Sequence, residues 1–237
     1  MNAQTDLPQA LQHMIDKAIS AVQNHPRHEL GQARRRAIYD VLRLSPRGEV
    51  ASLWLALFAA QKVLPIYEHA LAAIDEYQAI DESGVSIVQK PRHMLAAAEL
   101  TLQGTHSWEA MRAARDDFYQ DMHLGFDRRV PYLALIAAYE AVCEVTGTVP
   151  LSSRISKAVQ CDRGTTVYVS SDKWTDEELA GAGANAADAA VNAAYAYAQM
   201  PDTREIDYVK VLQFWTWWLR EAIPQAWTIA GDAQPAG

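Results

Sequence analysis

Cysteine is scarce in this chain, whose 237 residues include only Cys143 and Cys161. They form no CxxC pair, so the sequence predicts neither a disulfide framework nor a thiolate zinc site. Long uncharged apolar runs are also missing, since the longest, near 51–61 and 189–200, fall short of the roughly 18 residues that a membrane span needs. No basic segment followed by an apolar one stands at the start, and we therefore expect a cytoplasmic protein.

Basic residues are outnumbered, with 21 lysines and arginines against 29 aspartates and glutamates and a net charge of −8. A surface of this sign repels a phosphate backbone, so nucleic acid is not expected as a direct ligand. The sequence also has no HExxH, no glycine-rich phosphate loop and no GxSxG. It therefore predicts no catalytic residue, no cofactor and no metal site.

Apolar residues, by contrast, make up 50% of the chain and recur at helical spacing almost from end to end. This periodicity predicts helices over 7–23, 29–44, 49–77, 91–103, 108–122, 130–145, 185–199 and from 206 to Pro224. Asn24-His25-Pro26 should end the first helix, and Ser45-Pro46-Arg47-Gly48 should close the second. Pro65 and Pro224 are each expected to kink or end the helix that contains them.

Residues 148–173 lack the helical spacing of apolar residues that the rest of the chain shows. Two β-prone runs flank Asp162-Arg163-Gly164, which predicts a β-hairpin near 157–169. No low-complexity linker or internal repeat divides the chain. We therefore expect one all-α domain over 1–237, a bundle of about eight helices with this small hairpin insertion and with flexible ends at 1–6 and 230–237.

Asp116, Asp117 and Asp121 form a DDxxxD run on a predicted helix, and such aspartates can hold Mg²⁺ against a diphosphate. On a helical wheel Asp117 and Asp121 point away from the apolar stripe, which favours a solvated face. His25 and His28 have an HxxH spacing, but they straddle a proline and share no helical face. A small metal-dependent enzyme using the three aspartates is thus the alternative function.

Charge is unevenly distributed along the chain. Residues 27–47 hold six arginines against Glu29 and Asp40, a net of +4, whereas residues 172–188 carry a net of −4. The two segments could attract one another within the fold. Alternatively, an exposed acidic stretch steers a basic partner, and it consists of Trp174 with Asp172, Asp176, Glu177 and Glu178. A capping box that begins at Thr175 explains the same carboxylates equally well.

The most distinctive local sequence is the tryptophan-rich segment 214–227. On a helical wheel Trp215 and Trp218 share a broad apolar face, which predicts that both are buried. Trp217 falls on the opposite side, beside Lys210 and Arg220. It therefore belongs either to a helix buried all round or to a surface where an aromatic side chain contacts a partner.

The sequence VLQFWTWWLREAIPQAW at 211–227 resembles the C-terminal signature of an all-helical immunity-protein family found beside bacterial polymorphic toxins, the family numbered five among them. Residues 34–38 resemble its early basic helix, 59–68 its helix ending in Leu-Pro, and 91–104 its middle helix. Two segments, 148–173 and 183–188, depart from the family pattern. We expect any partner-specific surface to lie where the sequence departs.

The resemblance implies an antitoxin of interbacterial competition that binds a cognate toxin protein and neutralises it by occlusion, without catalysis. No membrane partner is expected, and the oligomeric state stays open. The charge and aromatic patterns supply the candidate contacts, which are Asp172, Trp174, Asp176, Glu177, Glu178 and Trp217.

Overall fold

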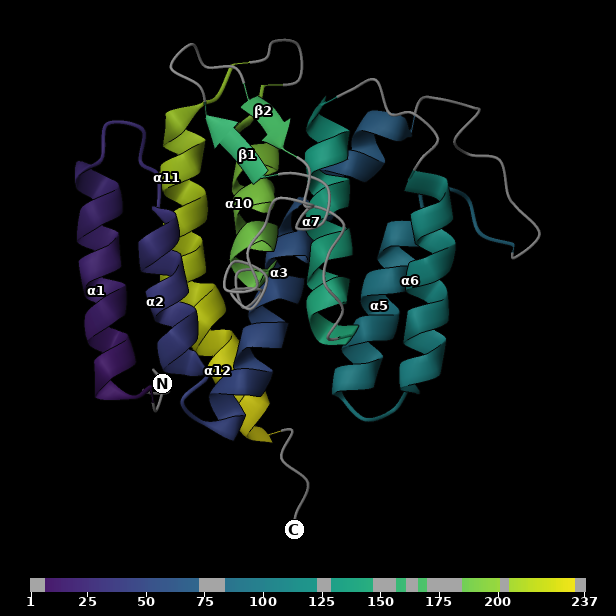
Figure 1. Cartoon of the computed structure of the whole chain (residues 1–237), viewed down its shortest axis with the longest axis horizontal. Coiled ribbons are helices and arrows are strands. Elements are labelled where there is room, and N and C mark those ends of the chain that lie inside the picture. The colour runs from purple at the N-terminus through teal and green to yellow at the C-terminus, as the bar shows by residue number, and fades with distance from the viewer. Residues whose placement is uncertain are drawn as a thin grey trace.

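Helices make up most of the chain that the computed structural model describes, which comprises residues 7–72, 84–122, 129–146, 157–160, 166–169, 185–200 and 205–232 (Figure 1). The all-α prediction is confirmed. In chain order the helices are α1 (Gln9–Asn24), α2 (Gln32–Leu42), α3 (Pro46–Leu71), α5 (Lys90–Leu102), α6 (Trp108–Met122), α7 (Arg129–Thr146), α10 (Asn185–Ala198), α11 (Tyr208–Trp217), the π-helical turn η3 (Trp218–Ala222) and α12 (Ile223–Asp232).

Two four-residue strands, β1 (Lys157–Gln160) and β2 (Thr166–Val169), pair in antiparallel register. The residues that connect them, and the segments that join them to the helices, lie outside the described chain. The hairpin insertion therefore stays a prediction.

The long helix α3 lies at the centre of the bundle, where α5, α7, α10 and α12 pack against it. Trp54, Leu55, Leu57 and Tyr67 are each at most 1% exposed, as expected for a helix that is apolar on nearly every side. Its length and hydropathy alone would suffice to cross a membrane, a test that core helices of soluble proteins also pass. Here 61% of its most apolar 18-residue window is buried inside the bundle.

The sequence predicted that Pro65 would either kink or end its helix. It does not end α3, which continues to Leu71. Its ring is exposed, so the Gln61 carbonyl that loses its helical N–H donor can bind water instead.

The prediction for residues 45–48 is wrong, since these residues open α3 rather than close α2. The Ser45 hydroxyl accepts a hydrogen bond from the Gly48 N–H at 3.1 Å and caps the helix.

Pro224 does not end the last helix either. Proline cannot donate to the carbonyl four residues earlier, and its ring crowds that carbonyl. Here the helix widens into η3, where the Ile223 N–H donates to the Trp218 carbonyl, five residues back. The helical path from Tyr208 thus continues to Asp232 and buries Ala230, so residues 230–232, predicted as part of the flexible end, are helical.

The helices at the two sides of α3 differ in position. α1 and α2 stand on one side of the bundle, beside α11 and α12, whereas α5 and α6 stand on the other (Figure 1). The loop between α1 and α2 lies at the same end of the bundle as the connection from α10 to α11 (Figure 1). This arrangement places the basic N-terminal helices against the tryptophan-rich C-terminal segment.

Candidate partner-binding surfaces

The tryptophans that dominate the C-terminal sequence are mostly internal. Trp215 is 3% exposed and Trp218 is fully buried, which confirms the prediction for both. The Trp218 ring lies edge-on to that of Trp215, with centroids 5.7 Å apart, and 5.9 Å from the ring of Tyr39 on α2. Aromatic pairs at these separations stabilise the packing of α2 on the last helix. They are unavailable to a partner.

Trp217 occupies an intermediate position, half-buried at the edge of the core. Its ring centroid lies 5.5 Å from that of Phe214, and the Lys62 ammonium of α3 lies 4.8 Å above the ring. The contact with Lys62 is a cation–π interaction across two helices. Part of the ring remains accessible, and its role as a partner contact stays a prediction.

The arginines of residues 27–47, which we call the basic stretch, include some that point into the core and others that are exposed. Arg35 is 8% exposed; it donates to the Leu30 carbonyl, and its guanidinium lies 5.7 Å from the Trp215 ring. Arg47 donates from Nε to the Trp227 carbonyl at 2.9 Å and stacks 4.6 Å from the Trp227 ring centroid. Both therefore hold the N-terminal helices against the C-terminal segment. Arg27, Arg34 and Arg36 are exposed.

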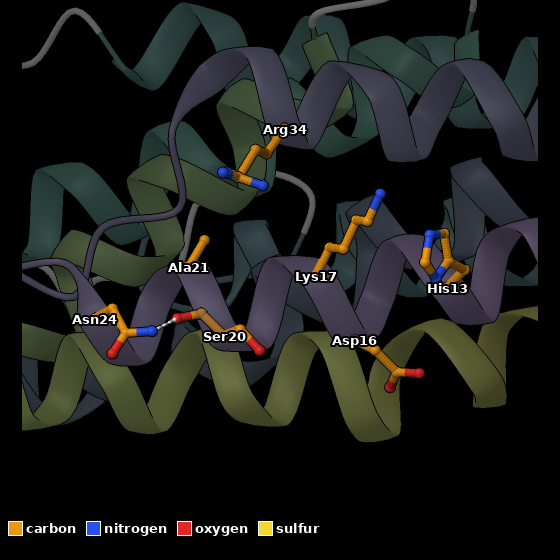
Figure 2. A pocket seen from close by; sticks show the side chains of 7 residues that line it. All are labelled: His13, Asp16, Lys17, Ser20, Ala21, Asn24 and Arg34. Carbon is orange, nitrogen blue, oxygen red and sulfur yellow. Dashed lines mark hydrogen bonds between the residues drawn. The ribbon is translucent and has the colours of Figure 1, made fainter.

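An open groove runs between α1 and α2 (Figure 2). Lys17 of α1 and Arg34 of α2 extend into it from opposite sides, whereas Asp16 points away (Figure 2). The groove is lined by His13, Asp16, Lys17, Ser20, Ala21, Asn24 and Arg34. The Asn24 amide donates to the Ser20 carbonyl at 2.8 Å and closes the last turn of α1. The surface that results is polar and carries more cationic than anionic groups.

The loop that joins α1 to α2 is fixed by its own side chains. His25 Nδ1 accepts hydrogen bonds from the backbone N–H groups of Arg27 and Glu29, at 3.2 and 3.3 Å. His28 adopts a positive φ of 53°, and its ring bonds to the Val22 carbonyl at 3.0 Å. The HxxH pair thus shapes a turn and presents no shared face for a metal ion.

Glu29 connects this loop to α10. The Tyr195 hydroxyl donates to Glu29 Oε1 at 3.0 Å. Burial is the main cause that raises the pKa of Tyr195 to about 12, and the charge and hydrogen bond of Glu29 act in the same direction. The tyrosine is therefore a neutral hydrogen-bond donor at physiological pH. This contact joins the loop between α1 and α2 to α10.

The aspartate run on α6 is engaged with cations of its own chain. Asp116 pairs with Arg115 at 2.6 Å and Asp117 with Lys90 at 3.1 Å, and both carboxylates are largely exposed. The side chain of Asp121 lies outside the described residues. Within the described residues, no three potential metal ligands gather in one place. These positions form an exposed face of α6 with surface ion pairs.

The acidic stretch predicted as a partner contact lies outside the described chain. This applies to Asp172, Trp174, Asp176, Glu177 and Glu178, so their contact role stays a prediction. The possible attraction between residues 27–47 and 172–188 is likewise outside the described contacts.

Sequence reasoning missed one exposed apolar patch, at the corner between α10 and α11. Met200, Tyr208 and Val209 are 39%, 38% and 61% exposed there. The corner is held by backbone hydrogen bonds from Met200 to Glu205 and from Asp207 to Ala198, and the Asp207 carboxylate caps α11. The only local signal was an apolar pair at the first turn of a helix. Exposed apolar residues of this size can anchor a protein interface.

Comparison with known proteins assigns the chain to a protein family. No curated protein matches the sequence. The model of the family described as immunity protein Imm5, however, matches residues 15–225. The match extends from the buried face of α1, through the central α3, to Trp215, Trp218 and the proline that follows η3. It covers most of the chain, which therefore belongs to the immunity protein Imm5 family.

Proposed function

We propose that this protein neutralises a cognate bacterial toxin by binding to the toxin domain and covering its active site, without catalysing a reaction itself. The observation that carries the proposal is the family match over residues 15–225. The toxin would belong to a polymorphic toxin system of interbacterial competition. Neutralisation would take place in the cytoplasm, where the producing cell needs protection.

The distribution of aromatic side chains supports binding by the outer surface of a stable scaffold. Trp215 and Trp218 are committed to the core, so contacts must come from exposed groups. Interfaces of tight inhibitors bury roughly 1,600 Å² and depend on a few anchor residues. A helical bundle suits this role because rigid elements lose little conformational entropy on binding.

We place the first contact surface on the acidic stretch formed by Asp172, Trp174, Asp176, Glu177 and Glu178. Toxins that act on phosphate-rich substrates line their active sites with lysine and arginine. An acidic stretch imitates the charge of such a substrate, and Trp174 supplies an aromatic anchor beside it. Trp217 is the next candidate, because its ring is only half-buried.

Coexpression with the cognate toxin domain tests the function directly. The parent protein should restore growth and should copurify with the toxin. Reversal of Asp176, Glu177 and Glu178 to lysine should slow association and reduce its dependence on salt. The matched control reverses Asp40, Glu109 and Glu221, which are exposed on described helices.

Two results would contradict this proposal at different levels. Failure of the parent protein to bind or neutralise the toxin would remove the function. An unchanged association rate at low ionic strength, together with a lower melting temperature, would instead assign the three carboxylates to helix capping at Thr175.

A further inference from the structure

The exposed charges of the α1–α2 hairpin differ in sign from the chain as a whole. The protein carries a net charge of −8. On α1, α2 and the loop between them, the exposed charged side chains are Lys17, Arg27, Arg34 and Arg36 against Asp16 and Asp40. This surface is therefore a cationic region on an acidic protein.

Lys17 of α1 and Arg34 of α2 are the lysine and arginine that line the groove, one from each helix (Figure 2). Within the described residues, no ion pair joins either of them to a carboxylate. Arg92 of α5, by contrast, makes two hydrogen bonds to Glu68 at 2.7 and 2.6 Å. The groove is thus lined by two cations from facing helices and by one carboxylate, that of Asp16, which points away from it (Figure 2).

The helices that carry these cations are firmly attached to the core. α1 buries Leu11, Ile15, Ala18, Ile19 and Val22. α2 buries Ile38, Tyr39 and Leu42, and the Tyr39 ring meets that of Trp218. The connecting loop is held through Tyr195 and Glu29. Because the scaffold is rigid, a partner need order only the two side chains, which lowers the entropic cost of binding.

We propose that the α1–α2 groove is a second contact surface that takes an acidic segment of the toxin. This inference rests on the proposed function. The Arg34 guanidinium offers a planar fork that suits bidentate contact with a carboxylate, and Lys17 adds a second positive charge from the facing helix. A protein segment is favoured over nucleic acid because the net charge of −8 repels a phosphate backbone beyond the groove.

The experiment measures binding of the cognate toxin domain to the full protein and to three variants. The variants are Arg34→Glu, the double variant Lys17→Glu with Arg34→Glu, and Arg112→Glu as the matched control. Arg112 is exposed on α6, on the other side of the bundle. We expect the single groove variant to weaken binding about tenfold and the double variant more, while the control stays within about twofold.

Each outcome of this experiment decides a different point. Equal affinity of the parent and both groove variants would overturn the groove assignment and leave the proposed function intact. No binding by the parent protein would overturn the function and the inference with it. Thermal melts of all variants should match the parent, because the substituted side chains are exposed.

A second probe separates the two kinds of anionic partner. A fluorescent peptide of ten glutamates and a fluorescent single-stranded DNA of twenty nucleotides are titrated with the parent and with Arg34→Glu. The inference predicts weak peptide binding that the variant loses. Tighter binding of the DNA, lost in the same variant, would assign the groove to nucleic acid and overturn the proposal.

Discussion

The tryptophan-rich segment from Tyr208 to Asp232 and the α1–α2 hairpin lie side by side, yet they use their most distinctive residues in opposite ways. The segment turns Trp215 and Trp218 inward, against α2 and against each other. The hairpin turns Lys17 and Arg34 outward, into an open groove. Residues that reveal the family therefore maintain the scaffold. If the protein recognises one particular toxin as proposed, that recognition must depend on exposed residues that family membership does not specify.

The same division appears within the basic stretch alone. Arg35 and Arg47 contact aromatic rings of the C-terminal segment, whereas Arg34 and Arg36 are exposed. Arginines that are close in the sequence thus have two different roles: some pack against the core, and others remain exposed to solvent. Substitutions at these positions separate stability from binding, and four predictions follow that comparison.

Truncation of Trp218 to alanine should give the largest loss of stability. The side chain is fully buried, and its removal leaves a cavity between α2 and the last helix. We expect a cost of about 3 to 5 kcal/mol, measured by urea unfolding. A variant as stable as the parent would show that the core assignment of this helix is wrong.

Replacement of Arg47 by alanine should cost about 2 kcal/mol. The variant loses the hydrogen bond to the Trp227 carbonyl and the stacking on its ring. Arg36→Ala is the control, since Arg36 is exposed on α2, and it should change stability by less than about 0.5 kcal/mol. Similar costs for both arginines, measured by chemical denaturation, would remove the distinction between inward and outward groups.

Truncation of Trp217 to alanine should have a smaller effect, of about 1.5 kcal/mol, because the ring is half-buried and shared between Phe214 and Lys62. The same variant tests its role as a contact. If Trp217 binds the toxin, affinity measured well below the melting temperature should fall by more than tenfold. Unchanged affinity would limit this tryptophan to packing.

Substitution of Tyr195 by phenylalanine should cost about 1 kcal/mol near neutral pH, because it removes the hydrogen bond to Glu29. The difference should depend on pH. The pKa of Tyr195 rises from its ordinary value of 10.0 to about 12 in the folded protein. Between these values the unfolded chain loses a proton that the folded protein retains, so the stability of the parent declines above pH 10.

The phenylalanine variant lacks this titration, so its own decline should be shallower over the same pH range. Denaturant melts of both proteins, run between neutral pH and about pH 11, compare the two slopes. Parallel slopes would show that Tyr195 titrates normally in the folded protein.

Much of the helical fold could be predicted from the sequence, because amphipathic periodicity and local caps are local properties. The end of α1 at Asn24 and the start of α6 at Trp108, where the Ser107 hydroxyl accepts from the Ala110 N–H, follow this rule. Of the two outcomes predicted for the prolines, a kink or an end of the helix, the second is wrong. Pro65 and Pro224 both lie within continuous helical paths, because one faces solvent and the other is accommodated by a wider turn.

The candidate surfaces were harder to predict, since exposure depends on distant parts of the chain. Arg34 and Arg35 are adjacent in sequence, but only the proximity of Trp215 turns Arg35 inward. Val209 lies at an exposed corner only because the chain folds back from Ala198 to Asp207. No local pattern distinguishes these cases. Composition could indicate the basic stretch but not which of its charges face a partner.

The contact between Arg47 and Trp227 also bears on when the protein becomes active during its synthesis. These residues lie 180 positions apart, and a Cβ on Gly231 would come within 2.6 Å of the same guanidinium. α3 also depends on α12 for part of its burial. The ribosome must therefore release nearly the whole described chain before the central helix is fully covered. If the protein neutralises a toxin as proposed, fully covered chains supply that protection, and a translation pause ahead of residue 208 would delay it.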